Sequence, residues 1–264
     1  MVQTENTAIV LRHANYRDND RMVTLLSPSR GRIDAIIRNC RKPKSHNLNA
    51  GELFALGDYM LYESGGHVTV TSVRLIETFY PLRSDYDRLA CGVYLLNLTE
   101  AVAEPEQEQQ ELFMLLLHTL SRLTFSAQQW QPLLAGFLLH FSACQGFKPR
   151  LNHCVHCGKA LPAAGPFFFD SEAGGVCCPD CRPHPAQTGA GGRTSFQEPL
   201  YDPAKKNLQP LSREQLAWMR AALTTGSASW VNSPSSYAPF SLLRDYVERR
   251  LGRRFKSGSQ LPPP

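Results

Sequence analysis

The sequence predicts a multidomain α+β protein in which a five-stranded barrel precedes a helical region containing an inserted four-cysteine ribbon. Three observations lead to this expectation. The first eighty residues read as short strands separated by turn residues, with no long amphipathic helix among them. Residues 84–146 show apolar side chains at helical spacing instead. Two Cys-x-x-Cys motifs then follow at a separation typical of a metal site.

Five strand candidates follow one another at the N-terminus. They cover residues 7–11, 21–26, 32–37, 53–62 and 67–71. Pro28 and Gly31 favour a hairpin between the second and third, and Gly65-Gly66 favours a turn between the fourth and fifth. Beyond residue 71 the apolar alternation changes parity, which indicates a bulge. These features predict a small closed barrel, of which the OB-fold is the common five-stranded form, although SH3-like barrels use similar strands.

A basic loop separates the third and fourth of these strands. Its cations are Arg38, Arg41, Lys42 and Lys44. Four cations in seven residues, stiffened by Pro43, suit phosphate oxygens at the mouth of the barrel, so the loop is a candidate nucleic-acid contact; a solvated loop is the plain alternative. Tyr16, Phe54 and Tyr62 offer stacking surfaces nearby, but aromatic residues in a barrel more often fill its core.

Three amphipathic helices are expected after the strands. Ser84-Asp-Tyr-Asp87 is a capping-box pattern that opens the first of them. Its expected apolar stripe is Leu89, Val93 and Leu96. The stripe of the second helix is Leu112, Leu115 or Leu116, Leu120 and Leu123. The third helix begins near Trp130 and should end at Gly146 in a left-handed C-cap, while His118 and His140 within these patterns are interpreted as packed side chains.

Two pairs of cysteines, separated by twenty residues, form the candidate metal site. They are Cys154 and Cys157 in the first pair, and Cys178 and Cys181 in the second. This spacing predicts one structural Zn²⁺ ion held by four thiolates, which close the coordination tetrahedron and leave no position for a reactive water. Gly158 and Pro179 supply the turns, and residues 167–176 supply a short hairpin. Reduced or disulfide-paired cysteines without metal are the alternative. Cys177, like Cys40, Cys91 and Cys144, is expected to be a small buried or half-buried hydrophobic residue, with replacement of Cys178 as a ligand as its alternative role.

The chain after the cysteines should contain a loop and two helices. Residues 187–207 are rich in Gly and Pro, which indicates a flexible linker. Ser212 and Gln215 form a capping box for the next helix, and residues 241–251 read as the last helix. A second basic cluster follows it, made of Arg249, Arg250, Arg253, Arg254 and Lys256. Cations favour a helix C-terminus, but five exceed what the helix dipole explains, so these residues are candidate DNA contacts that extend the basic face.

Composition limits the classes of protein that the chain can belong to. Residues 1–81 carry ten basic and eight acidic side chains, residues 82–146 three and seven, and residues 147–264 fifteen and eight. This basic–acidic–basic distribution suggests a polyanion partner. Free thiolates imply a reducing compartment, so a cytoplasmic, nucleoid-associated location is expected, with no signal peptide and no membrane span. The sequence shows neither a carboxylate cluster nor a nucleotide-binding motif, so nothing in it indicates an enzyme.

Several of these motifs together resemble the RecO family of bacterial recombination mediators. The resemblance rests on Thr7-Ala-Ile-Val-Leu-Arg12, Tyr16-Arg-Asp-Asn-Asp20, Leu25-Leu-Ser-Pro-Ser-Arg-Gly31, the basic loop, Leu75-Ile-Glu-Thr-Phe79, Gly146-Phe-Lys-Pro149, both cysteine pairs and Leu251-Gly-Arg-Arg-Phe-Lys-Ser257. It covers most of the chain apart from residues 185–210 and the tail. The alignment of Gly174-Gly175 makes Cys178 the metal ligand, and the extra Cys177 is where this sequence departs from the family.

The resemblance implies an OB-fold, a helical domain and a zinc finger. The expected boundaries are 1–81 for the OB-fold, 82–150 and 211–257 for the helical domain, 151–184 for the zinc ribbon, 185–210 for the linker and 258–264 for the tail. The resemblance also implies binding to single- and double-stranded DNA, strand annealing, and help in loading RecA on strands covered by single-strand-binding protein. RecR and single-strand-binding protein are the implied partners, with RecF as a further candidate. The alternatives are a zinc-ribbon RNA-binding or transcription adapter, and a nucleic-acid-modifying enzyme.

Overall fold

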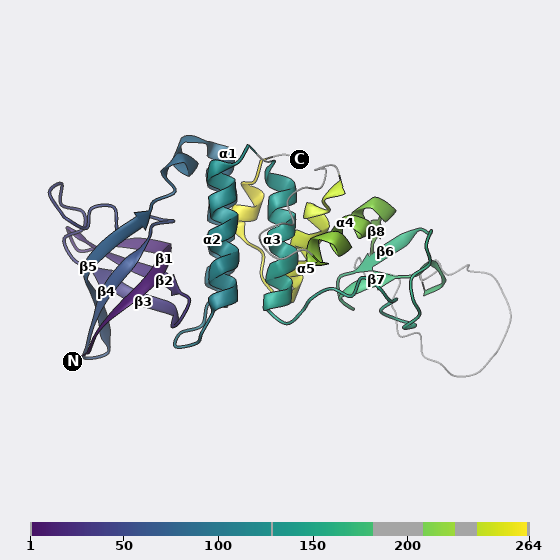
Figure 1. Cartoon of the computed structure of the whole chain (residues 1–264), viewed down its shortest axis with the longest axis horizontal. Coiled ribbons are helices and arrows are strands. Elements are labelled where there is room, and N and C mark those ends of the chain that lie inside the picture. Colours follow the sequence, from purple (N-terminus) through teal and green to yellow (C-terminus); the bar gives the residue numbers. More distant parts are fainter. Residues whose placement is uncertain (1, 128, 182–207, 225–236, 263–264) are drawn as a thin grey trace. The chain divides into compact units, whose positions relative to one another are not determined.

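Alternating apolar residues at the N-terminus form five strands that close into a barrel (Figure 1). The strands are β1 (Val2–Tyr16), β2 (Asp20–Ser27), β3 (Gly31–Ile37), β4 (Leu56–Ser64) and β5 (His67–Glu77). This computed structural model describes residues 2–127, 129–181, 208–224 and 237–262. It divides into two compact units, the first formed by Met1–Phe137 and Arg254–Pro264 and the second by Leu138–Arg253.

The barrel has the strand order β1-β2-β3-β5-β4, and β4 pairs with β1 to close it. Strands β3 and β5 are parallel and the other neighbours are antiparallel. This is the OB-fold, so the predicted fold is confirmed. The predicted bulge is also present, because Met60 pairs with Ser72 while Leu61 pairs with Val70, which leaves Thr71 as the extra residue.

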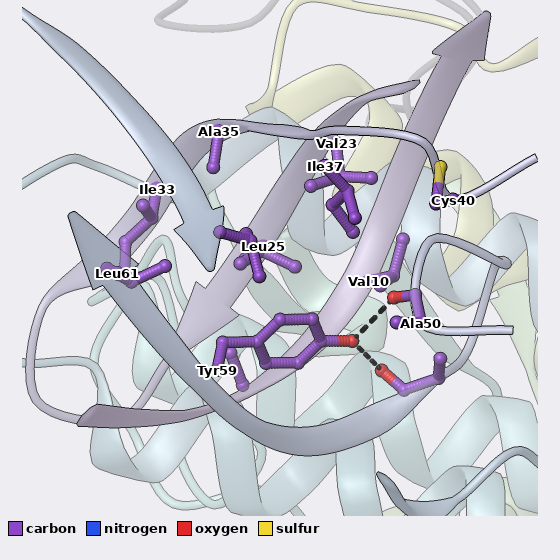
Figure 2. Close-up of a cluster of buried hydrophobic side chains, with 13 residues drawn as sticks. Val10, Val23, Leu25, Ile33, Ala35, Ile37, Cys40, Ala50, Tyr59 and Leu61 are labelled. Carbon is purple, nitrogen blue, oxygen red and sulfur yellow. Dashed lines mark hydrogen bonds between the residues drawn. The ribbon is translucent and has the colours of Figure 1, made fainter. Parts of the chain in front are cut away.

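Side chains from every strand fill the barrel. The core includes Ala8, Val10, Val23, Leu25, Ile33, Ala35, Ile37, Tyr59, Leu61 and Val70. Figure 2 shows that the Tyr59 hydroxyl points toward the loop between β3 and β4, where it donates to the carbonyl oxygens of Ala50 (2.9 Å) and Ala55 (3.3 Å). Cys40 and Ala50 from the same loop join the core, so the ends of the basic loop are fixed to the barrel.

The helices of the first unit are α1 (Tyr86–Val102), α2 (Gln110–Phe125) and the N-terminal part of α3 (Trp130–Cys144), preceded by the 3-10 helix η1 (Tyr80–Ser84). The predicted stripe of α2 is confirmed, since Leu112, Leu115, Leu116, Leu120 and Leu123 are all buried. Helix α3 ends at Cys144, and Gly146 forms the predicted left-handed cap beyond it, with φ +78° and its N–H donating to the Ala143 carbonyl (3.1 Å).

Two expectations for α1 were wrong. The N-cap is Asp85 rather than Ser84, because the Asp85 carboxylate accepts from the backbone N–H groups of Asp87 and Arg88. The predicted stripe is wrong at two of its three positions: Leu89 and Val93 are only half-buried, whereas Leu96 is buried as predicted. The fully buried side chains include Cys91, Tyr94, Leu95 and Leu98. Contacts with β1, α2 and the C-terminal segment surround the helix, and burial from several sides removes the simple one-face pattern.

The C-terminal segment packs on α1. Phe255 lies edge-on to Tyr94 with ring centroids 6.3 Å apart, and the Asn97 amide donates to the Ser257 hydroxyl (2.8 Å). The 3-10 helix η5 (Lys256–Ser259) follows, with Ser257 and Gly258 buried. The tail that the sequence predicts from residue 258 therefore begins at a packed position, and residues 263–264 lie outside the described residues.

The second unit combines a small sheet with helices (Figure 1). Its strands are β6 (Phe167–Asp170), β7 (Gly175–Cys177) and β8 (Leu208–Leu211), in the order β7-β6-β8, and its helices are η2 (Pro179–Cys181), α4 (Arg213–Thr224) and α5 (Phe240–Arg250). The predicted capping box of α4 is present, because Gln215 N–H donates to the Ser212 hydroxyl and Ser212 N–H donates to the Gln215 side chain. Strand β8 was not expected from the sequence.

The predicted linker falls mostly outside the described residues, which resume at Leu208 in β8. Across the described parts of the chain, none of the helices combines the length and apolar character needed to cross a membrane.

Candidate metal centre and nucleic-acid interface

Four cysteine sulfur atoms of the second unit come together at one point. They belong to Cys154, Cys157, Cys178 and Cys181, and all four atoms lie within 4.8 Å of one another. The sulfur atoms of Cys157 and Cys178 are 3.8 Å apart. A tetrahedral zinc with bonds of about 2.3 Å would place its sulfur ligands about 3.8 Å apart, so the cluster has the size that one such ion needs.

Tight turns present the two cysteine pairs. In the first, Gly158 adopts φ +71° and donates its N–H to the Cys154 carbonyl (3.0 Å), while Cys154 N–H donates to the Lys159 carbonyl (2.8 Å). In the second, η2 turns the chain so that Cys181 N–H donates to the Cys178 carbonyl (3.2 Å). The hairpin predicted from the sequence joins the two pairs, because β7 ends at Cys177 and β6 pairs with it.

The surroundings of the sulfur atoms favour the thiolate of Cys154 and disfavour those of Cys178 and Cys181. Burial alone would raise the pKa of Cys154, but backbone hydrogen bonds from Cys157, Cys178 and His156 lower it to about 6. Burial raises the pKa values of Cys178 and Cys181, and neighbouring sulfur atoms raise that of Cys181 further. Deprotonating all four groups therefore requires a compensating positive charge, which a divalent cation supplies.

Cys177 lies outside the group of four sulfur atoms. Its side chain is fully buried, and its S–H donates to the Cys178 carbonyl at 3.3 Å. Burial raises the pKa of Cys177 to about 12, so this sulfur remains a thiol at neutral pH. Of the two adjacent cysteines, Cys178 is thus the one that faces the metal-sized cluster.

The basic loop in the first unit leaves its cations exposed. Arg38, Arg41, Lys42 and Lys44 are all exposed, and within the described residues none of them has a carboxylate within ion-pair distance; the Arg41 guanidinium donates to the Asp18 carbonyl (3.1 Å). The other barrel cations differ: Arg21 pairs with Glu52 (2.5 Å) and Arg32 with Asp34 (2.9 Å). Arg12, Arg30 and Arg74 are likewise paired with carboxylates. Unpaired charge in the barrel is therefore concentrated on this loop.

A second segment joins the loop, and sequence reasoning missed it. The turn between β1 and β2 is held to the loop by Arg41, whose N–H donates to the Asn19 carbonyl (3.1 Å), and by Asn39, whose N–H donates to the Asp20 carboxylate (2.8 Å). Arg17 in this turn is exposed and has no carboxylate partner among the described residues; its guanidinium lies 5.1 Å from the centre of the Tyr16 ring. The sequence signal that could have revealed this segment is the adjacent Tyr16 and Arg17 between two predicted strands.

The three stacking candidates have different surroundings. Tyr16 is half-buried beside Arg17, and Tyr62 is half-buried on β4. Phe54 has no exposed surface and packs so closely on Gly92 that a Cβ there would lie 2.9 Å from its ring. Its backbone is left-handed (φ +70°), which also explains why β4 begins at Leu56 rather than Leu53. Phe54 is a core residue and is not available for stacking.

The second basic cluster is divided between the two units. Arg249, Arg250 and Arg253 belong to the second unit, and Arg254 and Lys256 belong to the first. All five are exposed, but the Arg250 side chain also donates to the Glu172 carbonyl at 2.9 Å. The five residues that read as one cluster in the sequence thus differ in their surroundings.

Comparison with known proteins agrees with this architecture. The family model described as "Recombination protein O N terminal" matches residues 1–79, and "Recombination protein O C terminal" matches residues 83–259. A curated DNA repair protein RecO from Anaeromyxobacter dehalogenans is 31% identical over 256 residues, covering 96% of this chain and 94% of its own length. RecO proteins from Symbiobacterium thermophilum and Alkaliphilus metalliredigens are each 33% identical; the matches cover 66% and 69% of this chain, and 69% and 72% of theirs.

A barrel of the OB type joined to a helical region with a four-cysteine cluster, together with these matches, places the chain among DNA repair proteins. The chain belongs to the RecO family.

Proposed function

We propose that the chain is a non-enzymatic repair factor that binds single- and double-stranded DNA and anneals complementary strands. The observation that carries this proposal is the concentration of unpaired cations at one end of the barrel. Half of the ten basic residues in the first eighty-one have no carboxylate partner among the described residues, and all five lie on the basic loop or the adjoining turn. Cations that the protein does not neutralise itself are available to phosphates.

The loop is suited to this role because its ends are fixed while its tip is exposed. Cys40 and Ala50 anchor it in the barrel core, and Arg41 holds it to the neighbouring turn. Cations on a fixed loop lose little conformational entropy when they meet a phosphate. Arg17 with Tyr16 extends the same surface, and Arg249, Arg253, Arg254 and Lys256 supply further phosphate contacts in this proposal.

Annealing follows from charge neutralisation without bond chemistry. Two complementary strands repel each other through their phosphates, and a protein surface that neutralises part of both lowers that repulsion. Annealing should therefore need neither nucleotide nor magnesium. Membership of the RecO family supports the further proposals that the chain helps load RecA on strands covered by single-strand-binding protein, and that RecR, single-strand-binding protein and RecF are its partners in the cytoplasm.

We further propose that the four cysteines hold one structural Zn²⁺ ion. Four cysteine sulfur atoms within 4.8 Å of one another suit zinc, and such a site is saturated by protein ligands. When bound, the ion supplies the positive charge that keeps all four sulfurs deprotonated and fixes the two turns relative to each other. Its role is to stabilise the ribbon.

Photo-crosslinking to single-stranded DNA, followed by peptide mapping, tests the proposed interface. Crosslinks are expected in peptides containing residues 16–17 and 38–44. A hydrolase acting on nucleic acid would instead consume its substrate under the same conditions, and an RNA-binding adapter would lose its crosslinks to competing RNA but not to competing DNA. Crosslinks confined to the cysteine ribbon would contradict the proposal.

A further inference from the structure

The turn between β6 and β7 is tied to the first cysteine pair by a buried carboxylate. Asp170 is 2% exposed, and one of its oxygens accepts from the N–H groups of Glu172 and Ala173, both at 2.9 Å. Its other oxygen contacts Nε2 of His156 at 3.0 Å, and His156 lies between Cys154 and Cys157. The conformation of this turn is therefore linked to that of the first cysteine pair.

The other side of the same turn is held by α5. Arg250 Nη2 donates to the Glu172 carbonyl at 2.9 Å, and the guanidinium lies 5.5 Å from the centre of the Tyr246 ring. Gly174 makes this approach possible: it has φ +75°, and a Cβ there would lie 2.5 Å from Arg250 Nη2 and 3.2 Å from the Tyr246 hydroxyl oxygen. The backbone of the turn thus lies directly against α5.

The Tyr246 ring, on which the Arg250 guanidinium lies, is itself held in place. Its hydroxyl donates to the Phe147 carbonyl at 2.6 Å, and its ring packs edge-on to Phe169 of β6 and to Phe147, with centroid distances of 5.2 and 5.9 Å. The ring is almost fully buried. Arg250 therefore rests on a rigid aromatic face and reaches a backbone carbonyl that Asp170 holds in place.

We propose that Arg250 is a positioning residue of the metal ribbon, through which metal binding orders the last turn of α5. The inference rests on the proposed metal binding and assigns Arg250 a role that is separate from DNA contact. Without metal, the two cysteine turns lose their common anchor, the turn held by Asp170 loses its fixed position, and the Glu172 carbonyl is no longer presented to Arg250. Because coupling is reciprocal, losing the Arg250 contact should also weaken metal binding.

Arginine suits this position better than lysine. A planar guanidinium can stack on the Tyr246 ring and donate in its own plane to the Glu172 carbonyl at the same time. A lysine ammonium retains the charge but does not offer this pair of contacts. Arg250→Lys therefore separates a positioning role from a phosphate contact, since a phosphate contact mainly requires the charge.

Hydrogen–deuterium exchange on the full chain tests the proposal. Zinc content is measured first, and exchange is then followed in peptides covering residues 243–253, with Zn²⁺ bound and after chelation. In the unchanged protein, chelation should raise exchange in the last turn of α5 by roughly tenfold, because its opening then costs about 1.4 kcal/mol less. In Arg250→Ala and Arg250→Lys, exchange should already be high with zinc bound, and chelation should add little.

Arg254→Ala is the matched control, because it removes the same charge from an exposed site, and it should retain the metal-dependent change. The proposal is overturned, with metal binding intact, if the protein binds one zinc but α5 exchange is the same after chelation. It is also overturned if Arg250→Lys behaves like the unchanged protein in exchange and in DNA binding, since Arg250 would then act by charge alone. A protein that retains no zinc would contradict the metal proposal and this inference together.

Discussion

Cys177 and Cys178 show how two identical side chains in adjacent positions acquire different roles. Both are buried in one cluster with Cys154, but only Cys178 belongs to the group of four sulfur atoms, while the Cys177 thiol donates to the Cys178 carbonyl. Spacing alone predicted the group of four, because Cys-x-x-Cys turns impose a local geometry. Spacing could not show that Cys177 is fully buried beside this group, since that depends on the pairing of β7 with β6.

Substitution of these two cysteines should therefore have opposite effects on metal content. Cys177→Ala should keep one zinc per chain and lose stability by roughly 1–2 kcal/mol from the small cavity. Cys154→Ser should lose stoichiometric zinc and unfold the ribbon. Elemental analysis of the purified variants, with chemical denaturation, makes the comparison. Loss of zinc from Cys177→Ala, with zinc retained in Cys154→Ser, would show that the ligand set is different.

Two glycines of the barrel provide a second comparison at this scale. Gly31 and Gly65 both have left-handed backbones, with φ +63° and +58°, but a Cβ at Gly31 would lie 2.2 Å from the Glu104 carbonyl oxygen, whereas nothing lies within 4 Å at Gly65. Gly65→Ala should cost about 1 kcal/mol for its backbone conformation. Gly31→Ala should cost roughly 3 kcal/mol or more, because the connection between α1 and α2 must also move. Equal unfolding free energies in urea would show that this contact is unimportant.

At the level of elements, sequence patterns predicted the structures that arise locally. The five barrel strands, the stripe of α2 and the capping box of α4 follow from alternation, helical spacing and capping chemistry. Strand β8 was not predicted, because Gln209 and Pro210 give it no strand pattern. Its partner β6 also lies about forty residues earlier in the chain. The sequence placed Arg250 in a basic cluster and did not predict its contact with Glu172. The acceptor in that contact is a backbone carbonyl, which no sequence pattern reveals.

Burial of His140 of α3 against α4 should make the stability of the second unit depend on pH. Burial lowers the pKa of His140, and the charge of Lys148 lowers it a little further. The hydrogen bond between His140 Nε2 and the Ala222 carbonyl (3.1 Å) raises this pKa, but burial has the larger effect. The folded state thus binds a proton less readily than the unfolded state, so stability should fall as the pH drops below about 6.5. His140→Gln should reduce this loss between pH 7 and pH 5, measured by urea denaturation. An identical pH dependence in the variant would mean that another group is responsible.

At the level of the whole molecule, the net charge of +5 says less about DNA binding than the question of which cations are paired with carboxylates. Five barrel arginines are neutralised by carboxylates within the first unit, and the remaining barrel cations gather on two joined turns. The sequence predicted the basic loop but not its extension to Arg17, because the turn that carries Arg17 meets the loop only after the barrel closes. Unpaired charge on a fixed loop is the basis for proposing DNA binding.

The salt dependence of DNA binding tests this central proposal most directly. The variant Arg38→Ala, Arg41→Ala, Lys42→Ala and Lys44→Ala removes four exposed cations, so its thermal stability should remain close to that of the unchanged protein. If all four contact phosphates, the slope of log affinity against log salt for single-stranded DNA should fall by about 3, at about 0.7 per contact. An unchanged affinity and an unchanged slope in a folded variant would contradict the proposal that this loop binds DNA.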